Sequence, residues 1–164
     1  MKKVAVIMGS ASDLPVAEKA IDRLRELGIG FEVHVYSAHR TPAEAREFVC
    51  HAEENGFGVI IALAGMAAHL AGALAAGCVL PVIGVPVKSK NLDGVDALLS
   101  TVQMPTGIPV ATVAIDGAAN AALLAAEILA LGDAELSAKL KAKRKAEAEA
   151  VLAKDKEISE SFAD

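Results

Sequence analysis

Short apolar runs alternate along this chain with longer segments in which apolar residues recur every three or four positions. The short runs have the length of buried strands, and the longer segments have helical spacing. This alternation predicts an α/β fold, namely a three-layer α/β/α sandwich around a parallel sheet with right-handed crossovers. We expect a flavodoxin-like strand order of 2-1-3-4-5. The strands are expected at residues 4–8, 31–36, 59–62, 81–87 and 110–115.

The segments between the strands carry helix signals of different strength. Gly28 ends a predicted helix whose apolar face holds Leu14, Ala17, Ile21 and Leu24. In the second strand, polar residues alternate with apolar ones, which predicts an edge strand with one less buried face and a surface position for His34.

Three segments after the fourth predicted strand complete the chain with the fifth strand. A long connection at 88–107, with a short helix at 94–101, is expected to cover a pocket or build a subunit interface. An alanine-rich helix follows at 118–131. From Asp133 onward the sequence predicts one long charged helix, either a solvated surface or an arm across a neighbouring subunit. We therefore expect a single domain over 1–164, with 133–164 as a C-terminal helical arm.

The stretch Ser37-Ala38-His39-Arg40-Thr41-Pro42 lies between a predicted strand and a predicted helix. Thr41 and Glu44 have the spacing of a capping box, and Pro42 suits the first helical position. His39 and Arg40 would therefore lie at the carboxyl end of a strand, where open α/β sheets bind ligands. An imidazole, a guanidinium and free helix-start N–H groups suit an anionic ligand that needs a proton moved. The alternative is two solvated loop residues.

Two further strand-to-helix connections carry candidate residues. After the first strand, Ser10 and Ser12 offer hydroxyls, and Asp13 could hold sugar hydroxyls or merely cap the helix. After the third strand, His69 begins a helix of small residues, where it could be a core histidine bonded to a carbonyl. Because both histidines, His39 and His69, follow strands at the same sheet edge, a shared pocket is favoured.

Composition narrows the class of protein. The hydrophobic fraction of 54%, with much alanine, indicates that helix faces are buried against a partner subunit as well as in the core. No apolar run reaches the ~20 residues of a membrane span, and the N-terminus leads too directly into a strand for a signal peptide. The net charge of −5 argues against nucleic-acid binding. Cys50 and Cys78 are expected to be buried thiols of a cytoplasmic protein.

Several blocks, weak alone, occur here in one order. They are residues 8–13 (Met-Gly-Ser-Ala-Ser-Asp), 37–42, 67–70 (Ala-Ala-His-Leu), 84–87 (Gly-Val-Pro-Val), 102–105 (Val-Gln-Met-Pro) with 107–110, and 117–126. From about Val4 to about Leu131 the chain resembles the PurE family, in particular its class I N5-carboxyaminoimidazole ribonucleotide mutases of purine biosynthesis.

The resemblance implies a reaction and a set of residues. The carboxylate of N5-carboxyaminoimidazole ribonucleotide would move from the exocyclic nitrogen to C4, in a homo-octamer without metal or organic cofactor, on a substrate made by a separate ATP-dependent carboxylase. His39 would transfer the proton, with His69 beside it at the catalytic centre. The expected substrate-binding residues are Ser10, Ser12, Asp13, Ser37, Ala38, Arg40, Ala64, Gly65 and Leu70. The absence of a Walker motif and of metal-ligand spacing agrees with this expectation.

The third block departs from the usual family pattern, Gly-Ala-Gly-Gly-Ala-Ala-His-Leu-Pro-Gly. Leu63, Met66 and Ala71 replace two glycines and the proline, and Met66 is expected to narrow the pocket or change the loop. Two alternatives stay open: an aminoimidazole ribonucleotide carboxylase that uses carbon dioxide directly, and a non-catalytic nucleotide-binding module.

Overall fold

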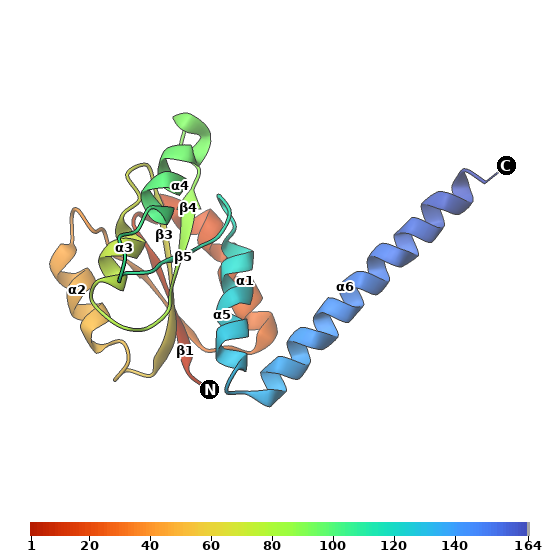
Figure 1. Ribbon diagram of the computed structural model, residues 1–164, viewed down its shortest axis with the longest axis horizontal. Coiled ribbons are helices and arrows are strands. Elements are labelled where there is room, and N and C mark those ends of the chain that lie inside the picture. Colours follow the sequence, from red (N-terminus) through yellow and green to blue (C-terminus); the bar gives the residue numbers. More distant parts are fainter. Residues whose placement is uncertain (164) are drawn as a thin grey trace.

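A five-stranded sheet forms the centre of the molecule, in a computed structural model that describes residues 1–163. Every neighbouring pair of strands is parallel, and the order is β2-β1-β3-β4-β5 (Figure 1). The predicted order 2-1-3-4-5 is confirmed. The strands are β1 (Lys3–Met8), β2 (Phe31–Val35), β3 (Phe57–Gly65), β4 (Val82–Val87) and β5 (Ala111–Thr112).

Helices cover both faces of the sheet, as the α/β/α prediction requires (Figure 1). Helices α1 and α5 pack on one face, and α2 and α3 pack on the other with α4 beside α3 and β4. The helices are α1 (Leu14–Leu27), α2 (Pro42–His51), α3 (Leu70–Ala75), α4 (Val95–Val102), α5 (Ala118–Ala130) and α6 (Ala134–Ser161), with 3₁₀ turns at Ala11–Asp13 and Leu92–Gly94.

Alternate residues of the strands feed two cores. In β1, Val4 and Val6 pack towards α1 and α5, while Ala5 and Ile7 pack towards α2 and α3. All four are fully buried, as is typical of a parallel strand covered on both faces. This close packing makes a rigid platform, so the loops at the strand ends are held in defined positions.

The second strand is at the edge, as predicted, but the exposure of its residues does not follow their polarity. Val33 and Val35 are exposed, whereas His34 and Tyr36 are partly buried. The two rings stack at 5.2 Å, and Phe48 of α2 lies 4.9 Å from His34. Aromatic packing against α2 therefore outweighs the polarity pattern, and the surface position expected for His34 was wrong.

Other local predictions need correction. The Thr41 side chain makes no capping bond to α2, so the predicted capping box is absent, although Pro42 does occupy the start of the helix. Leu14, placed on the buried face of α1, is 42% exposed, and Cys50, expected to be buried, is exposed. The fifth strand is only Ala111–Thr112, much shorter than predicted.

Helix α6 leaves the body of the molecule as a long projection (Figure 1). Asp133 caps it by accepting a hydrogen bond from Leu136 N–H at 2.9 Å, and the Leu136 side chain is fully buried. Arg144 pairs with Glu127 of α5, and beyond that point every described residue of the helix is exposed. Asp164, the last residue of the predicted arm, lies outside the described residues. Within residues 1–163 no helix has both the length and the apolar character that a membrane span requires.

Candidate functional site

A cleft of about 630 Å³ opens at the carboxyl ends of β1 to β4. It lies where the chain order of the strands reverses, between β1 and β3, which is the expected ligand position in such sheets. The cleft brings together all eleven predicted site residues: Ser10, Ser12, Asp13, Ser37, Ala38, His39, Arg40, Ala64, Gly65, His69 and Leu70. Their individual roles stay predictions, but the sequence blocks that they come from meet in one place.

The turn between β1 and α1 is held by reciprocal hydrogen bonds. Ser10 N–H donates to Asp13 Oδ2 at 3.1 Å, and Ser10 Oγ accepts from Ser12 N–H at 3.3 Å and from Ser12 Oγ at 2.8 Å. Asp13 therefore closes this turn instead of capping α1 with its side chain. Burial raises the pKa of the Asp13 carboxyl, against the lowering effect of the hydrogen bonds from Ser10 and Ser12.

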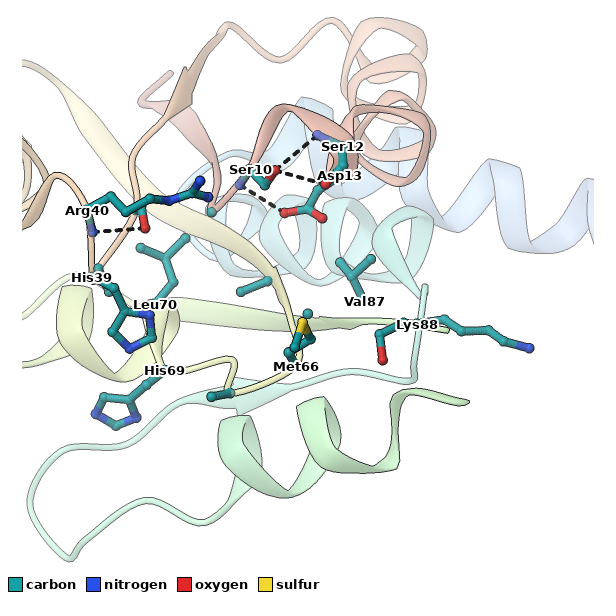
Figure 2. Close-up of a pocket in the computed structure, with 17 residues that line it drawn as sticks. Ser10, Ser12, Asp13, His39, Arg40, Met66, His69, Leu70, Val87 and Lys88 are labelled. Carbon is teal, nitrogen blue, oxygen red and sulfur yellow. Dashed lines mark hydrogen bonds between the residues drawn. The ribbon is translucent and has the colours of Figure 1, made fainter. Parts of the chain in front are cut away.

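The turn between β2 and α2 is closed by the hydroxyls of Ser37 and Thr41. Thr41 Oγ1 accepts from Ser37 N–H at 2.8 Å, and Ser37 Oγ accepts from Arg40 N–H at 3.2 Å. This explains why Thr41 is not available to cap α2. His39 and Arg40 are left exposed at the tip, and Arg40 extends towards the Ser10 turn (Figure 2). Arg40 forms no ion pair within residues 1–163, so its guanidinium is available to an anion.

The loop between β3 and α3 carries the second histidine. Met66 has a positive φ of 56°, and tight turns follow, with Ala68 N–H bonded to Met66 O and His69 N–H to Ala67 O, both at 2.8 Å. His69 is exposed at the start of α3, so the core-histidine alternative is wrong. Figure 2 shows the rings of His39 and His69 on the same side of the cleft.

The sequence reasoning missed the wall that the end of β4 supplies. Val87, Lys88 and Ser89 line the cleft there. Lys88 N–H donates to Asp116 at 2.9 Å, and its ammonium lies 2.9 Å from Asp93. Val87 ends β4, and Lys88 and Ser89 begin the long connection that was expected to cover a pocket or build a subunit interface, so the length of that connection was the available signal.

The chemistry of the lining suits a small polar anion with an apolar portion. Arg40 and the serine hydroxyls can bind an anionic group, Asp13 can accept from sugar hydroxyls, and the two imidazoles can move protons. In the described part of the chain, no three His, Cys, Asp or Glu side chains gather as metal ligands would.

Comparison with known proteins gives consistent matches. The family model described as AIR carboxylase matches residues 3–150. A Pyrococcus abyssi protein named N5-carboxyaminoimidazole ribonucleotide mutase is 60% identical over 86% of this chain and 81% of its own length. A protein of the same name from Methanocaldococcus jannaschii is 53% identical over 97% and 99%. The crystal structure of Treponema denticola PurE superposes with a TM-score of 0.87 at 31% identity, covering 94% of this chain and 96% of that one.

Proposed function

This chain belongs to the AIR carboxylase family, and we propose that it is an N5-carboxyaminoimidazole ribonucleotide mutase. Such an enzyme is an isomerase that moves a carboxylate from the exocyclic nitrogen to ring carbon C4, giving 4-carboxy-5-aminoimidazole ribonucleotide for purine biosynthesis. The names of relatives at 53% and 60% identity support the proposal. The observation that carries it is the meeting of His39, Arg40 and the Ser10–Asp13 turn in one cleft.

The ribonucleotide is held by its ends. Arg40, with Ser12 and Ser37, binds the 5′-phosphate, because an unpaired guanidinium and hydroxyls supply charge-assisted hydrogen bonds. Ser10 and Asp13 bind the ribose side. The imidazole ring and its carboxylate lie against a set of small or apolar residues: Ala38, Ala64, Gly65 and Leu70. Binding energy from the phosphate thus positions a reacting ring that is itself held by few polar contacts.

The reaction needs one proton to be given and one to be taken. Protonating the nitrogen of the N-carboxylate breaks the N–C bond and frees carbon dioxide. C4 of the aminoimidazole then attacks that carbon dioxide, and the C4 proton leaves to restore the ring. An imidazole with a pKa near neutrality can perform both transfers, so we assign them to His39, with His69 beside it in the cleft. No step requires ATP.

A second candidate is an aminoimidazole ribonucleotide carboxylase that takes carbon dioxide from solution. The description of the matching family model, AIR carboxylase, supports this candidate. The two activities share the C4 attack and differ in the source of the carboxyl group. Purified protein assayed without ATP, with each carboxyl source in turn, separates them. If the protein turned over aminoimidazole ribonucleotide at ambient carbon dioxide and did not turn over the N5-carboxylated substrate, the result would favour the carboxylase.

The central test compares the wild type, His39→Asn and a matched control, His51→Asn. His51 is an exposed histidine of α2 outside the cleft lining, bonded to Glu47 O at 2.9 Å. We expect His39→Asn to lower kcat by about 10²–10⁴-fold and His51→Asn to leave it unchanged. An active His39→Asn would refute the proton-transfer role. A wild type that binds the ribonucleotide without turning it over would identify a non-catalytic nucleotide-binding module.

We also propose that the chain works as a homo-octamer in the cytoplasm, on substrate supplied by an ATP-dependent carboxylase. The exposed apolar surface on β2 and the projecting α6 both offer area for contacts between copies. Light scattering on the full chain tests the assembly, and a stable monomer would contradict it. Removing residues 146–164 tests whether this part of α6 is needed for assembly. In a single copy of the chain the described residues of this segment, 146–163, are all exposed, so their removal leaves the core of that copy intact.

A further inference from the structure

The block at residues 102–105 (Val-Gln-Met-Pro) has no role in the function described so far. It begins at the last residue of α4, and none of its residues lines the cleft. Met104 N–H donates to Val102 O at 2.9 Å, so the chain turns sharply after the helix, and the Met104 side chain is partly buried. The direction of this turn brings Met104 to the β3–α3 loop.

The Met104 side chain and the His69 ring meet beside Gly72. A Cβ atom on Gly72 would lie 2.6 Å from His69 Cε1 and 3.0 Å from Met104 Sδ. Those two atoms are therefore at most 5.6 Å apart (2.6 plus 3.0). A thioether sulfur about 5 Å from an aromatic ring makes a favourable contact. Gly72 leaves space for the ring, and Met104 borders that space.

Packing, and not hydrogen bonding, orients the His69 ring. Within residues 1–163 the histidine rings that form hydrogen bonds are those of His34 and His51, and the His69 ring forms none. The His69 backbone is fixed, because its N–H donates to Ala67 O at 2.8 Å and its carbonyl accepts from Ala73 N–H at 2.9 Å. A ring held only through its backbone would distribute over about three χ1 wells and two χ2 orientations.

The end of α4 is fastened to the loop that carries His69. The hydroxyl of Thr101, a buried residue, donates to Ala97 O at 2.7 Å, with Ala68 O 3.3 Å away. Ala68 is the residue before His69, so this contact sets the separation between the end of α4 and the start of α3. Met104 follows shortly after Thr101 and is thereby held at a defined place beside the ring.

We propose that Met104 is a positioning residue for His69, whose ring it holds in the orientation that serves proton transfer in the cleft. This inference rests on the proposed mutase function. Met104 lies outside the cleft lining, so it acts through the ring and not on the substrate. A ring free to sample about six orientations would be productive roughly one-sixth of the time. The loss should appear in kcat, because proton transfer depends on geometry, and not in KM.

The test is a double-mutant cycle on the full chain, with N5-carboxyaminoimidazole ribonucleotide as substrate. We expect Met104→Ala to lower kcat roughly sixfold and to leave KM within about twofold of wild type. In the His69→Asn background the same substitution should change kcat by less than about twofold, because no ring is left to hold. Met104→Leu conserves volume and should keep kcat within about twofold of wild type. Leu92→Ala is the matched control, since Leu92 is an exposed apolar residue of the same connection outside the cleft lining.

NMR of isotope-labelled histidine rings and methionine methyl groups gives a readout that does not depend on turnover. In wild type we expect a nuclear Overhauser effect between the Met104 methyl group and the His69 ring, and one set of signals for that ring. In Met104→Ala the His69 signals should become averaged or multiple, while thermal melts show that the variant is folded.

The outcomes separate this inference from the function it rests on. If wild type forms no C4-carboxylated product, the mutase proposal fails. If wild type is active and Met104→Ala keeps its kcat, or loses as much activity without the His69 ring as with it, only the role of Met104 is refuted. A Met104→Leu variant as impaired as Met104→Ala refutes that role too. So does an unchanged His69 ring signal in Met104→Ala, even where His69→Asn is too slow to measure.

Discussion

Gly72 provides the space in which the His69 ring lies, which makes Gly72→Ala an informative substitution. Gly72 belongs to the first turn of α3, three residues after His69. A Cβ atom at this position would lie 2.6 Å from His69 Cε1, 3.1 Å from His69 Nδ1 and 3.0 Å from Met104 Sδ. The His69 side chain is exposed, so the ring can move away while the backbone keeps its place.

The size of the effect follows from these distances. Ordinary contact begins at 3.4 Å, so the ring must move by at least 0.8 Å (3.4 minus 2.6) or take another rotamer. A misplacement of about 1 Å in a catalytic site can cost about 10²-fold in rate. Helix propensity favours alanine over glycine by about 0.5–1 kcal/mol, which offsets the new contact with Met104. We therefore expect kcat to fall roughly 100-fold while stability changes by less than about 1 kcal/mol.

The assay measures turnover of N5-carboxyaminoimidazole ribonucleotide and thermal unfolding on the same samples, with NMR of the histidine rings to observe His69 directly. Gly132→Ala is the control, because a Cβ there meets nothing within 4 Å. Activity within twofold of wild type would refute the claim that the position of His69 matters. Activity that falls only together with the melting temperature would mean that Gly72 acts through stability instead.

Three further predictions concern ionisation. Burial raises the pKa of Asp13 above its ordinary 3.8, so we expect the free energy of unfolding to decline as pH rises from 3.8 through the folded-state pKa. Thermal melts of Asp13→Asn at several pH values should lack that decline, and the variant should also lose activity. The hydrogen bond from Lys3 lowers the pKa of Glu32 below 4.5, so Glu32→Gln should lower the free energy of unfolding at pH 7 by less than about 1 kcal/mol. The difference in stability between wild type and Glu32→Gln should vanish as pH falls through the folded-state pKa of Glu32. Cys50 is exposed and burial raises the pKa of Cys78, so a thiol reagent at pH 7 should label Cys50 first; faster labelling of Cys78 in mass spectra would contradict this.

The fold was predictable because its strongest signals are local and redundant. The buried strands β1, β3 and β4 are continuous apolar runs, and such runs in alternation with helices specify a parallel sheet. Gly28 adopts a φ of 71° at the end of α1, which is the conformation its position predicted. The apolar periodicity and the residues that end helices predicted the same element boundaries, so few other topologies were compatible with the sequence.

The wrong local predictions have a common cause: the deciding partner is distant in sequence or competes for the same atom. The hydroxyl of Thr41 can cap α2 or close the turn at Ser37, and a sequence pattern contains no information about which bond forms. Likewise His34 looks like a surface residue until Phe48 of α2 supplies a ring to pack on. Propensity describes a residue alone, whereas these choices depend on tertiary contacts.

In the cleft, too, some features follow from local sequence signals and others depend on contacts between residues that are distant in sequence. Its eleven predicted residues lie at or just after strand ends, and the parallel topology brings these strand ends to one edge of the sheet. The β4 wall depends on how the chain leaves β4 at residues 87–89, and the space beside His69 depends on where the long connection places Met104. No periodicity signals either arrangement. Methionine itself gives no sign of the positive φ at position 66, because it is uncommon in that conformation, and the glycine of the family pattern at this position was the available signal.

The charges in the cleft determine which way round an anionic ligand binds. The chain carries a net charge of −5, and at physiological salt charges beyond about 8 Å are largely screened, so attraction has to come from inside the cleft. Lys88, on the β4 wall, forms an ion pair with Asp93 at 2.9 Å, whereas Arg40 has no carboxylate partner within residues 1–163. We therefore expect the phosphate of a ribonucleotide to bind at the β2–α2 turn. In that orientation its ring would extend towards the β3–α3 loop, which carries the small side chains, Met66 and His69.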